Sequence, residues 1–273
     1  MTGTLAQLIS LTTHGNAYLV TGDLPVDFNT TNSTFQFCKK VNFIAMKKLF
    51  FFSKPKETIV AITPTDWFKM IKKEGCKKLR LYFQNSKDQS FAQDHKLAGM
   101  VGGGGTWLIE AIHDNYSDYW ANRWEVKDQN DPDRKIWEVS YGLTASHDNT
   151  TNMKVDLDSI KKEINQTLVE IAFFASQLKY QGWTEQFDKA RAVLSSTNPS
   201  ENYYHKDLIV SANYSLTAQQ VLFAAGSAWV FGGMGSWNDI GFDNKEDEKK
   251  YDELSAKLYD NINQSILAAV NSY

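Results

Sequence analysis

The chain has 273 residues, of which 42% are hydrophobic and 13% aromatic, so it can bury a large core and is not intrinsically disordered. Its two cysteines, Cys38 and Cys76, are too few for a disulfide framework or a cysteine-rich metal site. The formal net charge of −3 combines a balance of +8 in residues 1–87 (13 Lys and Arg against 5 Asp and Glu) with −11 in the remainder. A basic, aromatic half can bind nucleic acid, but its lysines are scattered in pairs without an arginine cluster, so we expect no nucleic-acid partner.

The sequence favours a cytoplasmic location. It begins without the basic segment and apolar run of a secretory signal, and two cysteines suit a reducing compartment. Seven Asn-x-Ser/Thr triplets point the other way, because such triplets accept glycans in secreted proteins. Two of them fall in predicted helices, and a chain rich in Asn, Ser and Thr produces such triplets by composition. The triplets start at Asn29, Asn32, Asn115, Asn149, Asn165, Asn213 and Asn263.

Strands are predicted through residues 1–62, where short apolar, alternating or β-branched runs recur. The run Val41–Phe52 is long enough for a single bent strand or for two strands. The runs are Ala17–Val20, Thr34–Phe37, Val41–Phe52 and Ile59–Ile62.

A helix is expected to follow the last of these runs. Thr63 is a natural N-cap, Pro64 suits the first helical position, and Asp66 favours the positive end of the helix. Gly75 is expected to end the helix, and an alternating strand follows. Ile59–Phe83 therefore predicts a strand–helix–strand unit.

Four consecutive glycines, Gly102–Gly105, lie between two further predicted strands, Leu97–Val101 and Thr106–Ile112. The run lacks the Gly-Lys-Ser/Thr ending of a phosphate-binding loop, and no helix clearly follows it. We therefore expect a tight connection where backbones approach closely.

Two similar triplets predict a β-hairpin. Arg123–Val126 and Ile136–Val139 both contain Trp-Glu-Val and flank a turn-forming loop. Because side chains alternate along a strand, Trp and Val face one way and Glu the other. Symmetrical pairing places Glu125 directly opposite Glu138, with the β-carbons about 5 Å apart.

This pair is the most specific candidate for chemistry. Two carboxylates at such a distance repel, and one can hold a proton near neutral pH, as an acid–base or glycosidase-type site requires. In this hypothesis Arg123 sets which carboxylate ionises; alternatively, Arg123 neutralises a solvated pair. The candidate substrate-binding residues are Trp107, Trp120, Trp124 and Trp137.

The second half of the sequence predicts helices. A long amphipathic helix is expected from Asp156, its cap, to the residues before Gly182, and a shorter helix over Trp183–Leu194. The last helix follows a charged loop, Asp239–Lys250. It carries a stripe formed by Tyr251, Leu254, Leu258, Ile262, Ile266 and Val270.

Val221–Trp237 is apolar or small at every position, which predicts a buried central helix over about Ala218–Phe231. Thr217 and Gln220 form a capping-box pattern at its start, and Gly232, Gly233 and Gly235 are expected to end it. Polar Asn238 and Asp239 follow directly. They either reach a ligand cleft or cap exposed backbone.

Together these patterns predict an α+β fold, with a mixed or antiparallel sheet in residues 1–150 and a helical portion in 151–273. We expect a single domain; a division near Asp148–Met153 is the alternative. Neither a metal site nor a cofactor motif is found, and no membrane segment is expected. Self-association stays open.

The general character of the chain is similar to that of bacterial immunity or accessory proteins that act by binding. This predicts a cytoplasmic binding protein with a protein partner or small ligand. A hydrolase that uses the paired glutamates in a Trp-rich cleft is the alternative.

Overall fold

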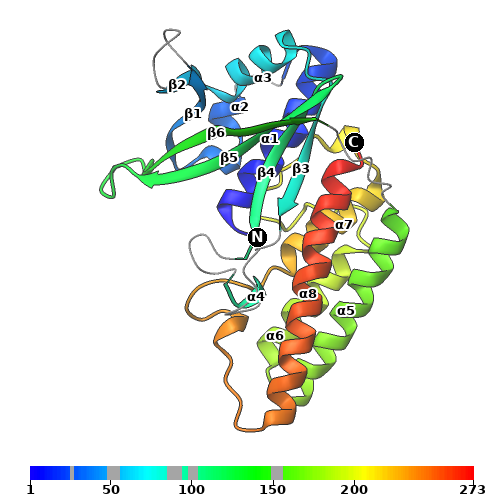
Figure 1. Ribbon diagram of the computed structural model, residues 1–273. Coiled ribbons are helices and arrows are strands. Elements are labelled where there is room, and N and C mark those ends of the chain that lie inside the picture. The colour runs from blue at the N-terminus through cyan, green and yellow to red at the C-terminus, as the bar shows by residue number, and fades with distance from the viewer. Residues whose placement is uncertain (25–27, 48–55, 85–93, 98–103, 149–155) are drawn as a thin grey trace.

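A computed structural model describes residues 1–24, 28–47, 56–84, 94–97, 104–148 and 156–273. It confirms the predicted α+β class, with a six-stranded sheet in the N-terminal half and most of the helical residues in the C-terminal half (Figure 1). One cluster of buried hydrophobic side chains draws on both halves. No helix in these ranges is long and apolar enough to cross a lipid bilayer.

The sheet has the strand order β2-β1-β6-β5-β4-β3. Only β1 and β6 run parallel, and the other neighbours are antiparallel. The predicted strand–helix–strand unit is present, but its two strands, β2 and β3, lie at opposite edges of the sheet. The strands are β1 (Cys38–Lys47), β2 (Lys56–Ala61), β3 (Lys78–Gln84), β4 (Thr106–Ile112), β5 (Tyr116–Val126) and β6 (Trp137–Asp148).

The helix between β2 and β3, α3 (Pro64–Lys73), begins as predicted. Thr63 accepts a hydrogen bond from the Asp66 backbone N–H at 3.1 Å, and Pro64 occupies the first turn. Trp67 is fully buried and stacks on Phe43 of β1 with ring centroids 4.5 Å apart. This contact holds α3 against the sheet.

The C-terminal half forms four long helices, and the predicted stripe of the last one is buried. Several predicted ends were wrong. Ser215, not Thr217, caps α7, and α7 ends before the glycines; Gly182 lies in the first turn of α6; and α8 begins inside the predicted charged loop. The helices are α5 (Leu157–Gln177), α6 (Gln181–Val193), α7 (Leu216–Ser227) and α8 (Lys245–Asn271).

The first helix, α1 (Gly3–Thr21), was not predicted. The strand expected at Ala17–Val20 is wrong, because these residues continue α1; the one expected at Thr34–Phe37 is replaced by the 3-10 turn η1 (Ser33–Phe35). Every residue of α1 from Leu5 to Tyr18 is buried, so it shows no apolar stripe from which a helix could be read.

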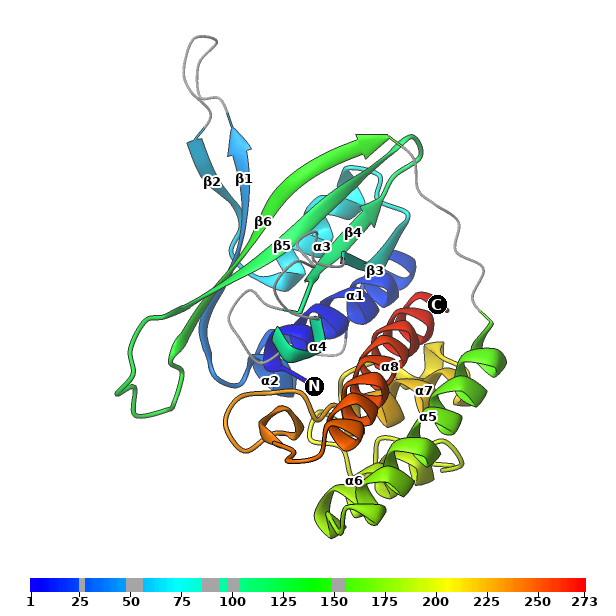
Figure 2. The ribbon, with the colours of Figure 1, turned by 60° about the horizontal axis from the view of Figure 1, so that its bottom comes forward.

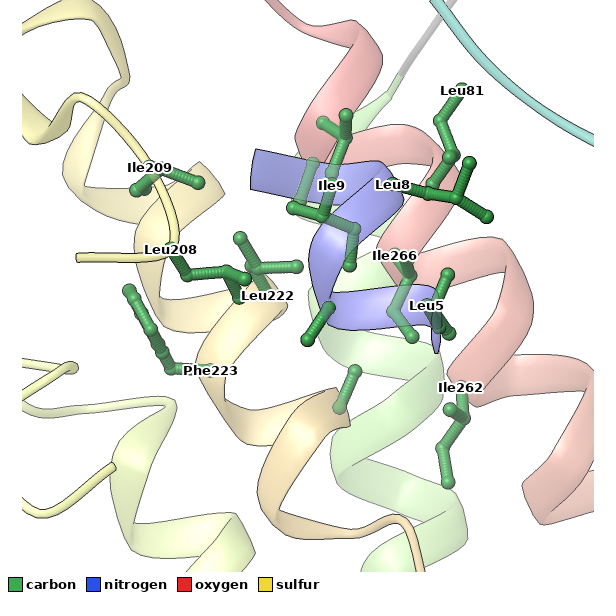
Figure 3. Close-up of a cluster of buried hydrophobic side chains, with 14 of the residues drawn as sticks. Leu5, Leu8, Ile9, Leu81, Leu208, Ile209, Leu222, Phe223, Ile262 and Ile266 are labelled. Carbon is green, nitrogen blue, oxygen red and sulfur yellow. The ribbon is translucent and has the colours of Figure 1, made fainter. Parts of the chain in front are cut away.

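In space, α1 lies between the sheet and the C-terminal helices (Figure 2). Figure 3 shows its side chains Leu5, Leu8 and Ile9 among Leu222 of α7 and Ile266 of α8. The central position that the sequence assigned to α7 is thus shared with α1.

The polar side chains of α1 connect it to its surroundings. Gln7 donates to the Thr34 carbonyl at 3.0 Å and accepts from the Tyr141 hydroxyl of β6 at 2.7 Å. Thr13 donates to the carbonyl of Leu208, in the connector between α6 and α7, at 3.1 Å.

Asn16 of α1 seals part of the outer edge of β3. Its side-chain amide accepts from the Leu79 N–H at 2.7 Å and donates to the Leu79 carbonyl at 2.8 Å. Asn271 of α8 bonds both backbone groups of Leu81 in the same way, at 2.8 Å each. Two side-chain amides thus take the place of a further strand.

The glycine run lies partly outside the described residues. Gly104 and Gly105 have positive φ angles of 77° and 86°, and a β-carbon on Gly105 would lie 2.6 Å from the Phe83 ring. Gly105 therefore sits at a close approach of the kind that the sequence predicted, and the positive φ of both residues suits glycine. Of the strand expected at Leu97–Val101, only Leu97 is described, and it belongs to α4 (Asp94–Leu97) instead. The remaining short elements are α2 (Phe28–Thr31), η2 (Ser211–Asn213) and η3 (Trp237–Asp239).

Gly15 allows α1 to approach the sheet, because a β-carbon there would lie 2.3 Å from Leu79 Cδ1 and 2.7 Å from Phe68 Cε1. We expect Gly15→Val to lower the free energy of unfolding by about 1–3 kcal/mol through overpacking. Urea denaturation checks this value. Gly182→Ala is the matched control, since nothing lies within 4 Å of its added carbon. Equal stability of Gly15→Val and wild type would contradict the tight packing of α1.

Candidate ligand-binding groove

The candidate site is built on the segment that follows α7. Trp237 anchors this segment: it is fully buried, and its indole N–H donates to Ser255 of α8 at 2.7 Å. Its ring also packs edge-to-face on Phe187 of α6, with centroids 5.2 Å apart. The Trp237 backbone N–H donates to the Val230 carbonyl at 3.2 Å, which closes residues 230–237 into a loop.

Asn238 and Asp239, which the sequence singled out, both bond to backbone. The Asp239 carboxylate accepts from the Gly235 N–H within the loop. Asn238 donates to the carbonyl of His95, in α4, at 3.1 Å, and lines a hollow of about 200 Å³ with Lys96 and Asp252. These bonds fix the end of the loop.

On its other side the loop forms one wall of a groove of about 660 Å³, hereafter the aromatic groove. The start of α6 forms the opposite wall. Trp183 and Trp229 are each half-buried at its surface, and Tyr180 is exposed. None of its lining residues carries a charge. They are Tyr180, Gln181, Gly182, Trp183, Gln186, Trp229, Val230, Phe231, Gly232 and Ser236.

Hydrogen bonds hold the walls of the aromatic groove in place. The Trp229 indole N–H donates to the Phe231 carbonyl at 2.8 Å, and Gln186 donates to the Ser227 carbonyl at 2.8 Å. Ser236 donates to the Gly232 carbonyl at 3.2 Å. No side chain caps the first turn of α6, which begins at the groove.

The hairpin glutamates have the predicted register. Glu125 of β5 lies opposite Glu138 of β6, with Trp124 opposite Val139. Different cations lie beside the two carboxylates: Arg123 lies 3.2 Å from Glu125, whereas Lys127 and Lys40 lie 3.5 Å and 3.9 Å from Glu138. The Glu125 side chain is 63% exposed and that of Glu138 is 24% exposed.

The tryptophans of this tract do not gather at the glutamates. Trp120 is buried in the core, 5.5 Å from Trp67 between ring centroids. Trp124 packs edge-to-face on Trp137 at 5.7 Å, on the strand face opposite Glu125 because side chains alternate. Trp107 packs on the Phe83 ring at 4.5 Å. The structure therefore pairs the carboxylates but does not surround them with these rings.

A cluster of Ser33, His205 and Asp207 was missed, because about 170 residues separate Ser33 from the other two. The Ser33 N–H donates to the Asp207 carboxylate at 2.6 Å, and its hydroxyl donates to the same group. The single hydroxyl proton is then used, so His205 Nδ1, 2.7 Å from Ser33 Oγ, is the donor to that oxygen. This order differs from a catalytic triad, in which histidine accepts the serine proton. The cluster fastens η1 to the α6–α7 connector.

The cysteines do not provide a nucleophile at neutral pH. Burial raises the pKa of the Cys76 thiol to about 12 and also raises the pKa of Cys38, so both stay protonated. Neither forms a disulfide. Over the described ranges, no three His, Cys, Asp or Glu residues come together in a way that could hold a metal ion.

Comparison with known proteins gives no relative for this arrangement: no family model, curated protein or solved structure matches the chain.

The environments of the glutamates lead to a contrast in stability. We expect Glu125→Gln and Glu138→Gln each to change the free energy of unfolding by less than about 1 kcal/mol, as is usual for exposed ion pairs. Glu110→Gln is the matched comparison, because Glu110 is fully buried and lies 2.7 Å from the Arg80 guanidinium. Removing the negative charge that faces this buried guanidinium costs about 3–5 kcal/mol. Chemical denaturation of the three variants measures the difference, and similar losses in all three would contradict it.

Proposed function

We propose that the protein acts by binding, and that the aromatic groove holds its ligand. The observation that carries this proposal is an uncharged groove of about 660 Å³ with aromatic rings half-exposed on two facing walls. Ligand sites in proteins are mostly concave and aromatic-lined, about 300–1,000 Å³ in volume, with a few polar groups that orient the ligand. Because hydrogen bonds already hold the residues that line this groove, a ligand can enter with little rearrangement of the protein.

The lining indicates the chemistry of the ligand. No charged side chain is present to balance an ionic group, so an ion would lose its hydration without compensation. Tryptophan and tyrosine rings offer flat apolar surfaces, and Gln186 and Ser236 offer polar atoms beside them. A neutral ring with polar substituents, such as a sugar or a nucleoside, combines both requirements.

We further propose a cytoplasmic location. The two cysteines are unpaired. Of the asparagines that begin glycosylation triplets, Asn32 and Asn263 are 4% and 3% exposed, so neither can carry a glycan in the folded chain. The unpaired cysteines support a reducing compartment, and the burial of Asn32 and Asn263 agrees with triplets that arise from composition. An immunity-like or accessory role, in which the ligand is displayed by a protein partner, belongs to the same proposal.

A hydrolase that uses Glu125 and Glu138 is a second candidate function, favoured by the directly opposed register of the two carboxylates. In such an enzyme, replacement of either glutamate by glutamine would abolish turnover, and the pH–rate profile would be bell-shaped. Hydrolysis of neutral aryl glycosides by wild type and by both variants separates this candidate from the binding proposal.

The binding proposal is tested by titrating the protein with neutral mono- and disaccharides and with nucleosides, followed by tryptophan fluorescence and calorimetry. We expect at least one of these probes to bind, and Trp229→Ala and Tyr180→Ala to weaken it at least about tenfold, which is the loss of about 1.4 kcal/mol of ring contact. Phe173→Ala is the control, because Phe173 is an exposed ring outside the lining.

Two outcomes contradict the proposal: no probe binds, or the groove variants bind as tightly as Phe173→Ala. Thermal unfolding of each variant shows whether a loss of binding reflects a loss of folding. Tyr180 is the safer position in this respect, since it is exposed and outside the core.

A further inference from the structure

A second groove lies between α5 and α6, which run side by side (Figure 2). Its volume is about 760 Å³, within the range of about 300–1,000 Å³ that is usual for small-molecule sites. In contrast to the aromatic groove, it is lined by charged side chains, and we call it the basic groove. Its cations are Lys161, Lys162 and Arg191, and its carboxylates are those of Asp158 and Asp188.

A buried amide holds Lys161 at the basic groove. Gln220 of α7 is 6% exposed, and its side-chain NH2 donates to the Ser196 carbonyl at 2.7 Å. This bond orients the amide, so that its oxygen accepts from Lys161 Nζ at 2.6 Å. The sequence placed Gln220 in a capping box, whereas the structure uses it to position a cation. Because the partner is a neutral amide, the ammonium keeps its full charge.

The carboxylates of the basic groove do not balance its cations. Asp188 is used by Arg191, whose Nη2 lies 3.3 Å from its carboxylate one turn along α6. In the described part of the chain, neither Lys161 nor Lys162 forms an ion pair with a carboxylate. Asp158 lies in the first turn of α5, where the positive end of the helix favours a carboxylate.

This excess of positive charge is local. Residues 156–273 as a whole are acidic, with 10 Lys and Arg against 16 Asp and Glu. The basic groove therefore offers an anion a site that its surroundings do not.

We propose that the basic groove binds a phosphate group, with Lys161 as its central contact. An ammonium carries three protons, and Gln220 uses one of those on Lys161, so two remain for ligand oxygens. Ammonium and guanidinium groups form strong, charge-assisted hydrogen bonds with phosphate. A phosphate dianion matches the two lysines that lack a carboxylate partner, whereas a neutral ligand leaves both charges uncompensated.

This site is independent of the function proposed for the aromatic groove. The helix α6 has 13 residues and is therefore roughly 20 Å long. Trp183, near its start, lines the aromatic groove, and Arg191, near its end, lines the basic groove. Ligands of the two grooves therefore do not compete for the same residues.

The test is calorimetric titration of the full chain with inorganic phosphate and with glycerol 3-phosphate, at a constant ionic strength. Glycerol is the uncharged comparison, and the tighter of the two phosphates shows whether a free phosphate or a phosphate ester is preferred. We expect phosphate to bind and glycerol not to bind. Lys161→Gln and Arg191→Gln should each weaken binding at least about tenfold, because each removes a charged donor. Lys161→Arg should keep most of the affinity.

Lys189→Gln is the matched control, because it removes the same charge from an exposed position of α6 outside the groove lining. It should bind phosphate as wild type does, and so should Trp229→Ala. Thermal unfolding of each variant shows whether the fold is kept.

Three results would overturn the proposal. In the first, neither inorganic phosphate nor glycerol 3-phosphate binds. In the second, Lys189→Gln weakens binding as much as Lys161→Gln, which indicates diffuse attraction to surface charge. In the third, the dicarboxylate succinate binds as tightly as phosphate, so the groove does not select a phosphate group.

Discussion

The fold depends on the helix α1, whose continuously buried stretch from Leu5 to Tyr18 includes many polar side chains. Among the buried residues of α1 are Gln7, Thr13, Asn16 and other polar side chains. Each unpaired polar group in such a place costs about 1–3 kcal/mol, so the helix is stable only where partners are supplied. The partners come from η1, β3, β6 and the α6–α7 connector. Satisfying α1 therefore positions both the sheet and the helical half.

The aromatic groove follows from the packing of the helical half. Small residues let α7 lie close to its neighbours: a β-carbon on Gly226 would lie 2.6 Å from the Tyr203 hydroxyl oxygen. The helix α7 ends at Ser227, and the loop that follows is fixed at its far end by Trp237, which is bonded to α8 and packed on α6. The residues between these points have little freedom, and Trp229 is held where it lines the groove together with Trp183.

The hairpin shows what local pattern can predict. Two Trp-Glu-Val triplets around a turn were enough to place Glu125 opposite Glu138, because strand alternation and pairing are short-range rules. The buried stripe of α8 was predictable for the same reason. The surroundings of a side chain, such as the cations beside Glu138 or the rings of the aromatic groove, depend instead on segments that are distant in the sequence.

The helix α1 and the aromatic groove were not predicted, because both depend on contacts between residues that are far apart in the sequence. Polar residues in α1 remove the apolar period, and the partners of their side chains lie far away in the sequence, 195 positions for Thr13 and Leu208. The groove joins Trp183 to Trp229, which no local motif relates. The segment 229–239 did stand out in the sequence through its glycines and tryptophans, but it indicated a loop without its opposite wall.

The seal on β3 also bears on how the chain matures as it is made. The Asn271 amide that closes the edge at Leu81 lies 190 residues later in the chain. All six strands have been synthesised once the chain reaches Asp148, long before Asn271 is added. Until α8 arrives, the nascent sheet carries an unpaired edge at Leu81, of the kind that recruits other chains and that chaperones cover. The β3 edge at Leu81 is therefore protected from pairing with other chains only after α8 has packed against the sheet.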